Sequence, residues 1–543
     1  MPSFRTALVS VWKGEMGIRH ISAYLKQNGY PVDLLFCPQY GDQLYTESQL
    51  ELIVRTAENH DLVGISCSTE MSKRRVVQIV EELRKLEQKP FVVLGGHAAT
   101  FTPEQALKYV DAVCIGEGEK PILDLVERLR TGRNIFLVPN IWSNENKTIR
   151  CITKEGPNLD AFSTIDYGYW GGDSGRYYRL VGDSLVEIKT PEESVLDIDR
   201  ITTATKDPLF KERTGVLFYT SSRGCASFCA YCQSPKLNEL YSGGKIRKRN
   251  VGLVIDDLQK IIAEHPNTTE ISFFDDDFFV RSLSEIDKFS RDYEERIGLP
   301  LFVYANPRTL NERKLQALAK AGKLTVNIGL QSGSEIVLRE IYRRGKQNNE
   351  KAVGAATILT DYAKSGIIER PWIDFIVNNP WATPEDVRDD VYLVKRLPKP
   401  FELHVHSLEL LPNSALYERA VRERRIKPVW DFAERPTGLM ATAELQDFTE
   451  HVKELQSGGH AYFTLLMYCL AGSNIGDYNG SIPSDRLDWL LGEPTKEKKE
   501  FLVESFLKNQ RVRHYLQERV NRGETEMKIR ERVESVLREK LGY

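Results

Sequence analysis

The chain has 543 residues, a formal net charge of −3, 41% hydrophobic residues and 28% charged residues, which is an ordinary globular composition with length for two to four domains. The small net charge gives no electrostatic support for nucleic acid or an anionic membrane surface as a partner, so neither is predicted. The longest apolar run, residues 461–472, is too short to span a bilayer, and the N-terminus has no apolar segment of signal-peptide length. The sequence therefore predicts a cytoplasmic protein with no membrane span.

The first 132 residues alternate short apolar runs with amphipathic helical stretches, five times in succession. Near-continuous apolar strands that alternate with helices indicate a parallel sheet covered on both faces. We therefore predict an α/β fold whose first domain, residues 1–132, is doubly wound. A ligand of such a domain lies beyond the carboxyl ends of the strands, where this chain has Gly- and Ser-rich turns.

The pattern changes twice further along the chain. Residues 133–212 are rich in Gly, Asp, Asn and aromatic residues and are predicted to be a linker. Six further strand-helix units over residues 213–423 predict a partial (β/α)6 barrel, in which the chemistry sits at the carboxyl ends of the strands. Residues 424–543 are charged and helical in pattern, so we predict a C-terminal helical domain.

Three of the eight cysteines lie together, directly after the first strand of the predicted barrel, at Cys225, Cys229 and Cys232. A structural zinc site needs four ligands, and no second Cys or Cys-His pair has suitable spacing, so zinc is the weaker interpretation. A 4Fe-4S cluster can be held by three thiolates, which leaves one iron open to a substrate. The remaining alternative is three coincidental thiols in a loop, and the position after a barrel strand argues against it.

The spacing Cys-x3-Cys-x2-Cys, with Tyr231 just before the last cysteine, resembles the signature of the radical S-adenosyl-L-methionine (SAM) superfamily. The resemblance covers residues 213–423. It implies that the three cysteines hold a 4Fe-4S cluster, that the open iron binds SAM, and that an electron donor such as flavodoxin or ferredoxin reduces the cluster. It also implies a small-molecule substrate.

Two more stretches resemble the SAM site of that superfamily. Asp275 and Asp276 follow the second barrel strand, where the family places the acidic group that holds the methionyl amine, although the family's Gly-Gly-Glu form is absent. Gln331 and Ser332 follow the fourth strand and match the turn that contacts the ribose and carboxylate, so they are expected to point into the barrel. Tyr231 would lie near the adenine. The alternative for the Asp run is a solvated turn that caps a helix.

A doubly wound domain directly upstream of such a barrel resembles the cobalamin-binding radical SAM subfamily. The resemblance implies that the turns after the strands contact the nucleotide tail and the corrin ring. The residues at the matching positions are Gly17, Ser66, Ser68, Gly95, Gly96, His97, Gly116 and Glu117.

One motif departs from cobalamin domains that supply a histidine to cobalt. Their first strand is followed by Asp-x-His-x-x-Gly, whereas this chain has Trp12 and Gly14 in the Asp and His positions and retains only Gly17. No histidine can ligate cobalt from there, and His20 is expected to be a half-buried helix residue. The departure fits the subfamily and also permits a domain that has lost cobalamin.

Three functions from different classes follow. The first is a cobalamin-dependent radical SAM methyltransferase acting on an unactivated carbon of a small metabolite. The second is a radical SAM enzyme of the same architecture that forms rings or rearranges its substrate, and the third is a non-enzymatic iron-sulfur or corrinoid sensor. The SAM-site motifs argue against the sensor. A tRNA methylthiotransferase would need a second cysteine set and a basic tail, and neither is found.

Overall fold

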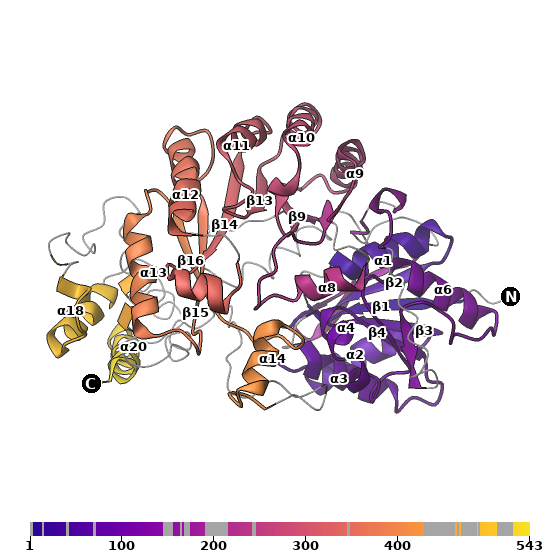
Figure 1. Ribbon diagram of the computed structural model, residues 1–543. Coiled ribbons are helices and arrows are strands. Elements are labelled where there is room, and N and C mark those ends of the chain that lie inside the picture. The colour runs from indigo at the N-terminus through magenta and orange to yellow at the C-terminus, as the bar shows by residue number, and fades with distance from the viewer. Residues whose placement is uncertain are drawn as a thin grey trace.

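The computed structural model describes most of the two domains that the sequence predicts. Two sheets organise these residues, one in the first third of the chain and the other in its middle (Figure 1). Gly14, the position of the missing cobalt ligand, lies outside the described residues. The described residues are 4–12, 16–39, 43–68, 72–144, 156–162, 165–167, 174–189, 215–241, 246–344, 348–427, 432, 462–463, 466–467, 486, 489–507 and 525–542.

The first domain is doubly wound, as predicted. Its sheet has the order β6-β5-β4-β3-β1-β2-β7-β8, with β1 to β5 mutually parallel. One core lies between the sheet and helices α2 and α3, and a second lies between the sheet and helices α1 and α6. The elements are β1 (Thr6–Ser10), α1 (Met16–Gln27), β2 (Val32–Phe36), α2 (Glu47–Ala57), β3 (Leu62–Ser66), α3 (Lys73–Leu83), β4 (Phe91–Gly95), α4 (His97–Phe101), α5 (Pro103–Ala106), β5 (Ala112–Cys114) and α6 (Glu119–Arg130).

The segment 133–212, predicted as a linker, instead extends this sheet at both edges. Strand β6 (Ile141–Ser143) pairs antiparallel with β5, and β7 (Tyr177–Val181) pairs parallel with β2. Strand β8 (Ser184–Ile188) returns antiparallel to β7 through a tight turn at Gly182, whose φ of 57° is in the left-handed region that such turns need. These strands are short and separated by polar residues, which hid their pattern in the sequence.

The second sheet forms the predicted partial barrel. Its order, β16-β15-β14-β13-β12-β9, follows the chain, and every pairing is parallel. The helices between the strands stand along its outer side (Figure 1). The strands are β9 (Val216–Tyr219), β12 (Glu270–Phe273), β13 (Leu301–Ala305), β14 (Leu324–Gln331), β15 (Trp372–Val377) and β16 (Glu402–Ser407), and the helices are α9 (Val251–Glu264), α10 (Leu283–Arg296), α11 (Glu312–Ala319), α12 (Asn349–Lys364), α13 (Pro384–Arg396) and α14 (Ala415–Arg422).

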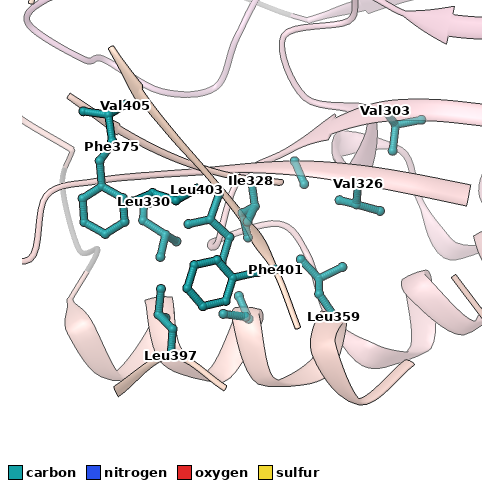
Figure 2. Close-up of a cluster of buried hydrophobic side chains, with 14 of the residues drawn as sticks. Val303, Val326, Ile328, Leu330, Leu359, Phe375, Leu397, Phe401, Leu403 and Val405 are labelled. Carbon is teal, nitrogen blue, oxygen red and sulfur yellow. The ribbon is translucent and has the colours of Figure 1, made fainter. Parts of the chain in front are cut away.

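Alternate residues of the barrel strands face the helices and build one core. Figure 2 shows Ile328, Leu330 and Phe375 from the strands against Leu359 and Leu397. Because side chains alternate across a strand, the residues between these positions face the inner side of the barrel. The strand sequences thus encode a dry outer face and a separate inner face.

The described part of the C-terminal region is helical, as predicted. Helices α18 (Lys496–Leu507) and α20 (Glu526–Leu541) contribute Leu502, Val503 and Leu537 to the same core as the barrel. No helix in the described ranges is long and apolar enough to cross a membrane.

Candidate functional site

A pocket of about 450 Å³ lies between the first domain and the barrel. Its first-domain wall consists of α1 and the turns that follow the parallel strands. All eight residues predicted to contact cobalamin line this wall: Gly17, Ser66, Ser68, Gly95, Gly96, His97, Gly116 and Glu117. The barrel wall includes Ser222, Arg223, Gly224, Ser234, Phe274 and Asp276. One of the two predicted acidic SAM ligands therefore faces the same space as the predicted cobalamin residues.

Two glycines of the first-domain wall have left-handed backbone conformations and no space for a Cβ atom, so no other residue fits at these positions. Gly96 has a φ of 93°, and a Cβ there would lie 2.6 Å from the carbonyl oxygen of Cys67. Gly116 has a φ of 77°, and a Cβ there would collide with the hydroxyl of Tyr241. The glycines thus allow the turns after β4 and β5 to pack closely while they line the pocket.

His20 is half-buried on α1, as expected, but it also lines the pocket, which the sequence did not indicate. Both imidazole nitrogens are buried and have no hydrogen-bond partner among the described residues. Burial lowers the pKa of His20 well below its usual value, and the guanidinium groups of Arg223 and Arg249 lower it further. The ring is therefore neutral, with one unused donor and one unused acceptor.

The three clustered cysteines lie on the loop between β10 (Ser222–Arg223) and α8 (Ser234–Leu240). The N–H of Ser227 donates to Cys225 Sγ at 3.4 Å, and the N–H of Ser234 donates to Cys232 Sγ at 3.3 Å. Burial raises the pKa of the Cys225 thiol to about 12, with contributions from Asp276 and the other two cysteines. The three sulfurs thus share one electrostatic environment.

Within the described part of the chain, no three His, Cys, Asp or Glu side chains gather closely enough to hold a single metal ion. The three cysteines do not need to converge on one point, because each thiolate of a 4Fe-4S site binds a different iron. The guanidinium of Arg344 lies 3.8 Å from Cys229 Sγ and donates at 2.7 Å to the hydroxyl of Tyr231. The Tyr231 ring packs edge-on against Tyr342, and its predicted place beside an adenine stays a prediction.

The two candidate aspartates have different surroundings. Asp275 is fully buried and accepts hydrogen bonds from the N–H and hydroxyl of Ser221, both at 2.6 Å, and from the N–H of Ser222 at 3.0 Å. Asp276 faces the pocket, and burial together with the neighbouring Asp275 raises its pKa to about 6. Asp275 therefore fixes the backbone that precedes the cysteine loop, and Asp276 is the carboxyl available to a ligand.

At the end of β14 the prediction for Ser332 is wrong, whereas the predicted inward direction of Gln331 stays a prediction. Ser332 was expected to point into the barrel, but its hydroxyl donates to Asp390 on the outer helix α13 at 2.7 Å. Gln331 has a φ of 73°, and the pairing of β14 with β15 shifts register between Gly329 and Gln331. The inward direction of Ser332 was expected from the resemblance to the family's turn, whereas a bulge just before it redirects the side chains that follow. Burial raises the pKa of Asp390 to about 7.

Ion pairs join the two walls of the pocket. Arg223 donates to Glu117 at 2.7 Å and to Glu119 at 2.5 Å, and Arg247 of β11 (Arg247–Lys248) also pairs with Glu117. The Glu117 N–H donates to the hydroxyl of Tyr241 at 2.6 Å. Burial opposes the charge on Arg223, but Glu119 and Glu117 raise its pKa on balance. The sequence singled out only Glu117 as a site residue. Arg223 opens the cysteine motif, and Arg247 lies in the basic stretch 243–249, which from its sequence favours a solvated loop over a substrate clamp.

Family models agree with this division of the chain. The B12 binding domain matches residues 14–126, and the radical SAM superfamily matches residues 219–393. An uncharacterised methyltransferase from Pyrococcus horikoshii, PH0819, is 26% identical over 344 residues, which are 62% of this chain and 64% of the relative. The anaerobic magnesium-protoporphyrin IX monomethyl ester cyclase of Rubrivivax gelatinosus is 24% identical over 62% of this chain and 55% of its own.

A solved structure has the same fold over nearly the whole chain. It is the radical SAM methyltransferase TsrM from Kitasatospora setae with cobalamin and a [4Fe-4S] cluster bound, which aligns with a TM-score of 0.57 over 95% of this chain and 100% of that one, at 15% identity. The chain spans less than two thirds of the length of the two curated relatives. The chain thus contains a B12 binding domain followed by a radical SAM domain, and its fold is that of the solved structure.

Replacing Arg223 with Met should destabilise the protein by about 3–5 kcal/mol, because Glu119, 3% exposed, would remain as a buried carboxylate without its cation. The change would appear as a lowered unfolding temperature. Arg339→Met is the matched control, since it removes an exposed pair with Glu340 and should leave the unfolding temperature unchanged. Equal unfolding temperatures for the two variants would contradict a stabilising contact between the domains.

Proposed function

We propose that the protein is a cobalamin-dependent radical SAM enzyme that methylates an unactivated carbon of a small molecule. The observation that carries the proposal is the shared pocket, since the turns that match a cobalamin site and the barrel residues around the cysteine loop face the same space. When bound, the cluster with SAM supplies a 5′-deoxyadenosyl radical, and cobalamin supplies a methyl group. The chain's own residues hold these groups, orient the substrate and exclude water.

The pocket fits a corrinoid in two respects. His20 contributes two buried nitrogens without partners, and the amide side chains around a corrin ring offer both the donor and the acceptor that a neutral imidazole lacks here. The turns at Gly96 and Gly116 add no side chain of their own to the first-domain wall, because a Cβ at either position would collide with Cys67 or Tyr241, so the backbone itself lines the pocket there. We therefore assign His20 to the edge of the corrin and not to the cobalt.

The cysteine loop fits a cluster in its donors. Backbone N–H groups of Ser227 and Ser234 and the guanidinium of Arg344 point at the three sulfurs. Such donors stabilise the negative charge that three thiolates bring to a cluster. We propose Asp276 as the group that holds the amine of SAM, and we propose reduced flavodoxin or ferredoxin in a cytoplasmic setting as the source of electrons.

The second candidate function is radical chemistry without methyl transfer, and the similarity to a ring-forming cyclase favours it. The two functions share the cluster, SAM and the barrel. They differ in the fate of the methyl group of SAM, so isotope labelling separates them.

Changing Asp276 to Asn should weaken SAM binding to cluster-loaded protein by about tenfold or more, because a charge-assisted hydrogen bond is lost. Asp275→Asn should lower the unfolding temperature, because Asp275 accepts three hydrogen bonds from Ser221 and Ser222. Equilibrium dialysis with labelled SAM and thermal unfolding measure the two effects. Wild-type SAM affinity in the Asp276→Asn variant would exclude Asp276 as the ligand.

Changing His20 to Leu should weaken cobalamin binding by about tenfold without lowering the unfolding temperature of the cofactor-free protein, because two buried, unsatisfied nitrogens are removed. His20→Gln keeps one donor and one acceptor and should retain most of the affinity. Absorbance titration with hydroxocobalamin measures binding. Nitrogen superhyperfine splitting in the Co(II) spectrum of the wild type, absent from His20→Leu, would instead make His20 the cobalt ligand.

With SAM that carries a deuterated methyl group, methyl transfer should give a product heavier by the labelled methyl. Deoxyadenosine and S-adenosylhomocysteine should form in equal amounts, because one SAM supplies the radical and another the methyl group. The variant with Ala at Cys225, Cys229 and Cys232 should contain no iron and form neither nucleoside. Deoxyadenosine without S-adenosylhomocysteine, with every substrate tried, would favour the ring-forming function.

A further inference from the structure

The inner face of the barrel has an apolar floor made of aromatic rings. Neighbouring rings are in contact from strand to strand. The ring centroids of Phe218 and Phe274 are 4.8 Å apart, and those of Phe274 and Tyr304 are 6.2 Å apart. The centroid of Phe302 lies 5.3 Å from that of Tyr304 and 5.0 Å from that of Trp372. Trp372 in turn stacks on His404 of β16 at 4.4 Å. Phe274 also lines the pocket, so the floor runs from the pocket to the far strands of the barrel.

Asp374 lies on this inner face, at the β15–β16 side of the floor. Its neighbours Ile373 and Phe375 are in the core that packs on the helices, so the alternation of β15 turns Asp374 inward. The register pairs it with Gly329 of β14 and His404 of β16. A carboxylate thus stands directly beside the aromatic floor.

The Oδ1 atom of Asp374 is buried and accepts no hydrogen bond within the described ranges. The nearest basic group is His406 Nε2 at 3.7 Å, too far for a hydrogen bond, and the His406 side chain is 49% exposed. On the next strand, the Oδ1 of the buried Asn327 also lacks a donor. A buried acceptor without a donor is costly, so this side of the inner face is prepared for a group that donates hydrogen bonds.

Two carboxylates, those of Asp374 and Glu402, face this side. The Arg344 guanidinium, which donates to the carbonyl of Gly329 beside Asp374, is also hydrogen-bonded to the hydroxyl of Tyr231. Glu402 is the other inward carboxylate of β15 and β16, and the nearby guanidinium of Arg370 lies 3.6 Å from it. No Lys or Arg of the described residues forms an ion pair with Asp374. A phosphate or carboxylate placed beside Asp374 would be repelled, and a cation would be attracted.

We propose that the substrate carries a protonated amine that binds Asp374, while its apolar body rests on the aromatic floor. The inference depends on the proposed function, because it takes the inner face of the barrel as the place where the substrate binds. It adds the chemical class of the substrate, an organic cation with an apolar framework, and a specificity-determining residue.

The test uses three probes with the same ring and different charges: 2-phenylethylamine, 2-phenylethanol and 3-phenylpropionate. Equilibrium dialysis against the full-length, cluster-loaded protein with SAM gives their dissociation constants. The amine should bind about tenfold more tightly than the alcohol, because a charge-assisted hydrogen bond to Asp374 contributes a free energy of that size. The anion should bind most weakly. In Asp374→Asn the amine and the alcohol should bind within about twofold of each other.

Two further variants separate recognition from a structural role. His406→Gln should keep the preference for the amine. If the role of Asp374 were only to position His406, His406→Gln would lose the preference as Asp374→Asn does. Asp361→Asn, an exposed acid paired with Lys364 on α12, should leave the preference unchanged. Asp374→Ser is a second neutral replacement in case the amide variant does not fold.

The inference is overturned if the wild type does not prefer the amine, if it prefers the anion, if Asp374→Asn keeps the preference, or if His406→Gln loses it as Asp374→Asn does. Cobalamin uptake and labelled-methyl transfer, measured on the same preparations, report on the proposed function separately. A protein that takes up cobalamin and transfers methyl but ignores probe charge contradicts only the substrate class. A protein that prefers the amine but consumes no methyl group contradicts only the methyltransferase.

Discussion

The contact of Arg223 with Glu117 and Glu119 is the constraint on which the site depends, because it joins two domains that each have their own sheet and core. Each domain supplies one wall of the pocket, and neither wall encloses a space by itself. Partly buried ion pairs with several hydrogen bonds fix a geometry well, although their net contribution to stability is modest. The network thus sets the distance and angle between the first-domain turns and the cysteine loop, which is what chemistry between two cofactors requires.

Much of this arrangement could be predicted from the sequence, because parallel strands impose it. Apolar strands that alternate with helices define both sheets, and their carboxyl ends meet at one edge, so the turns after β3, β4 and β5 necessarily share a wall. The three cysteines are recognisable from spacing alone. Side-chain direction was harder to predict: Ser332 turns outward because a bulge precedes it, and Asp275 and Asp276 are neighbours that only the fold distinguishes.

Residues whose contacts cross between the two domains could not be recognised from the sequence around them. Arg247 lies in a basic stretch that, from its sequence, suggests a solvated loop, yet it pairs with Glu117, 130 positions earlier in the chain. His20 resembles an ordinary helix residue in the sequence, yet it lines the pocket and its buried nitrogens have no partner among the described residues. Strands β6 and β7 were missed for a related reason, since each is stabilised by pairing with the edge of a sheet formed earlier in the sequence, and β8 pairs in turn with β7. Long-range pairing of this kind is invisible to periodicity.

The strand order of the barrel also separates two tasks in space. Strands β9 and β12 and the loops after them hold the cysteines and the aspartates, whereas β15 and β16, at the opposite edge of the same sheet, carry Asp374 and the inward histidines. With Asp374 as the proposed substrate-selecting residue, a lineage can exchange side chains on the β15–β16 edge while it keeps the cysteine loop at the opposite edge, so that substrate choice and radical chemistry evolve independently.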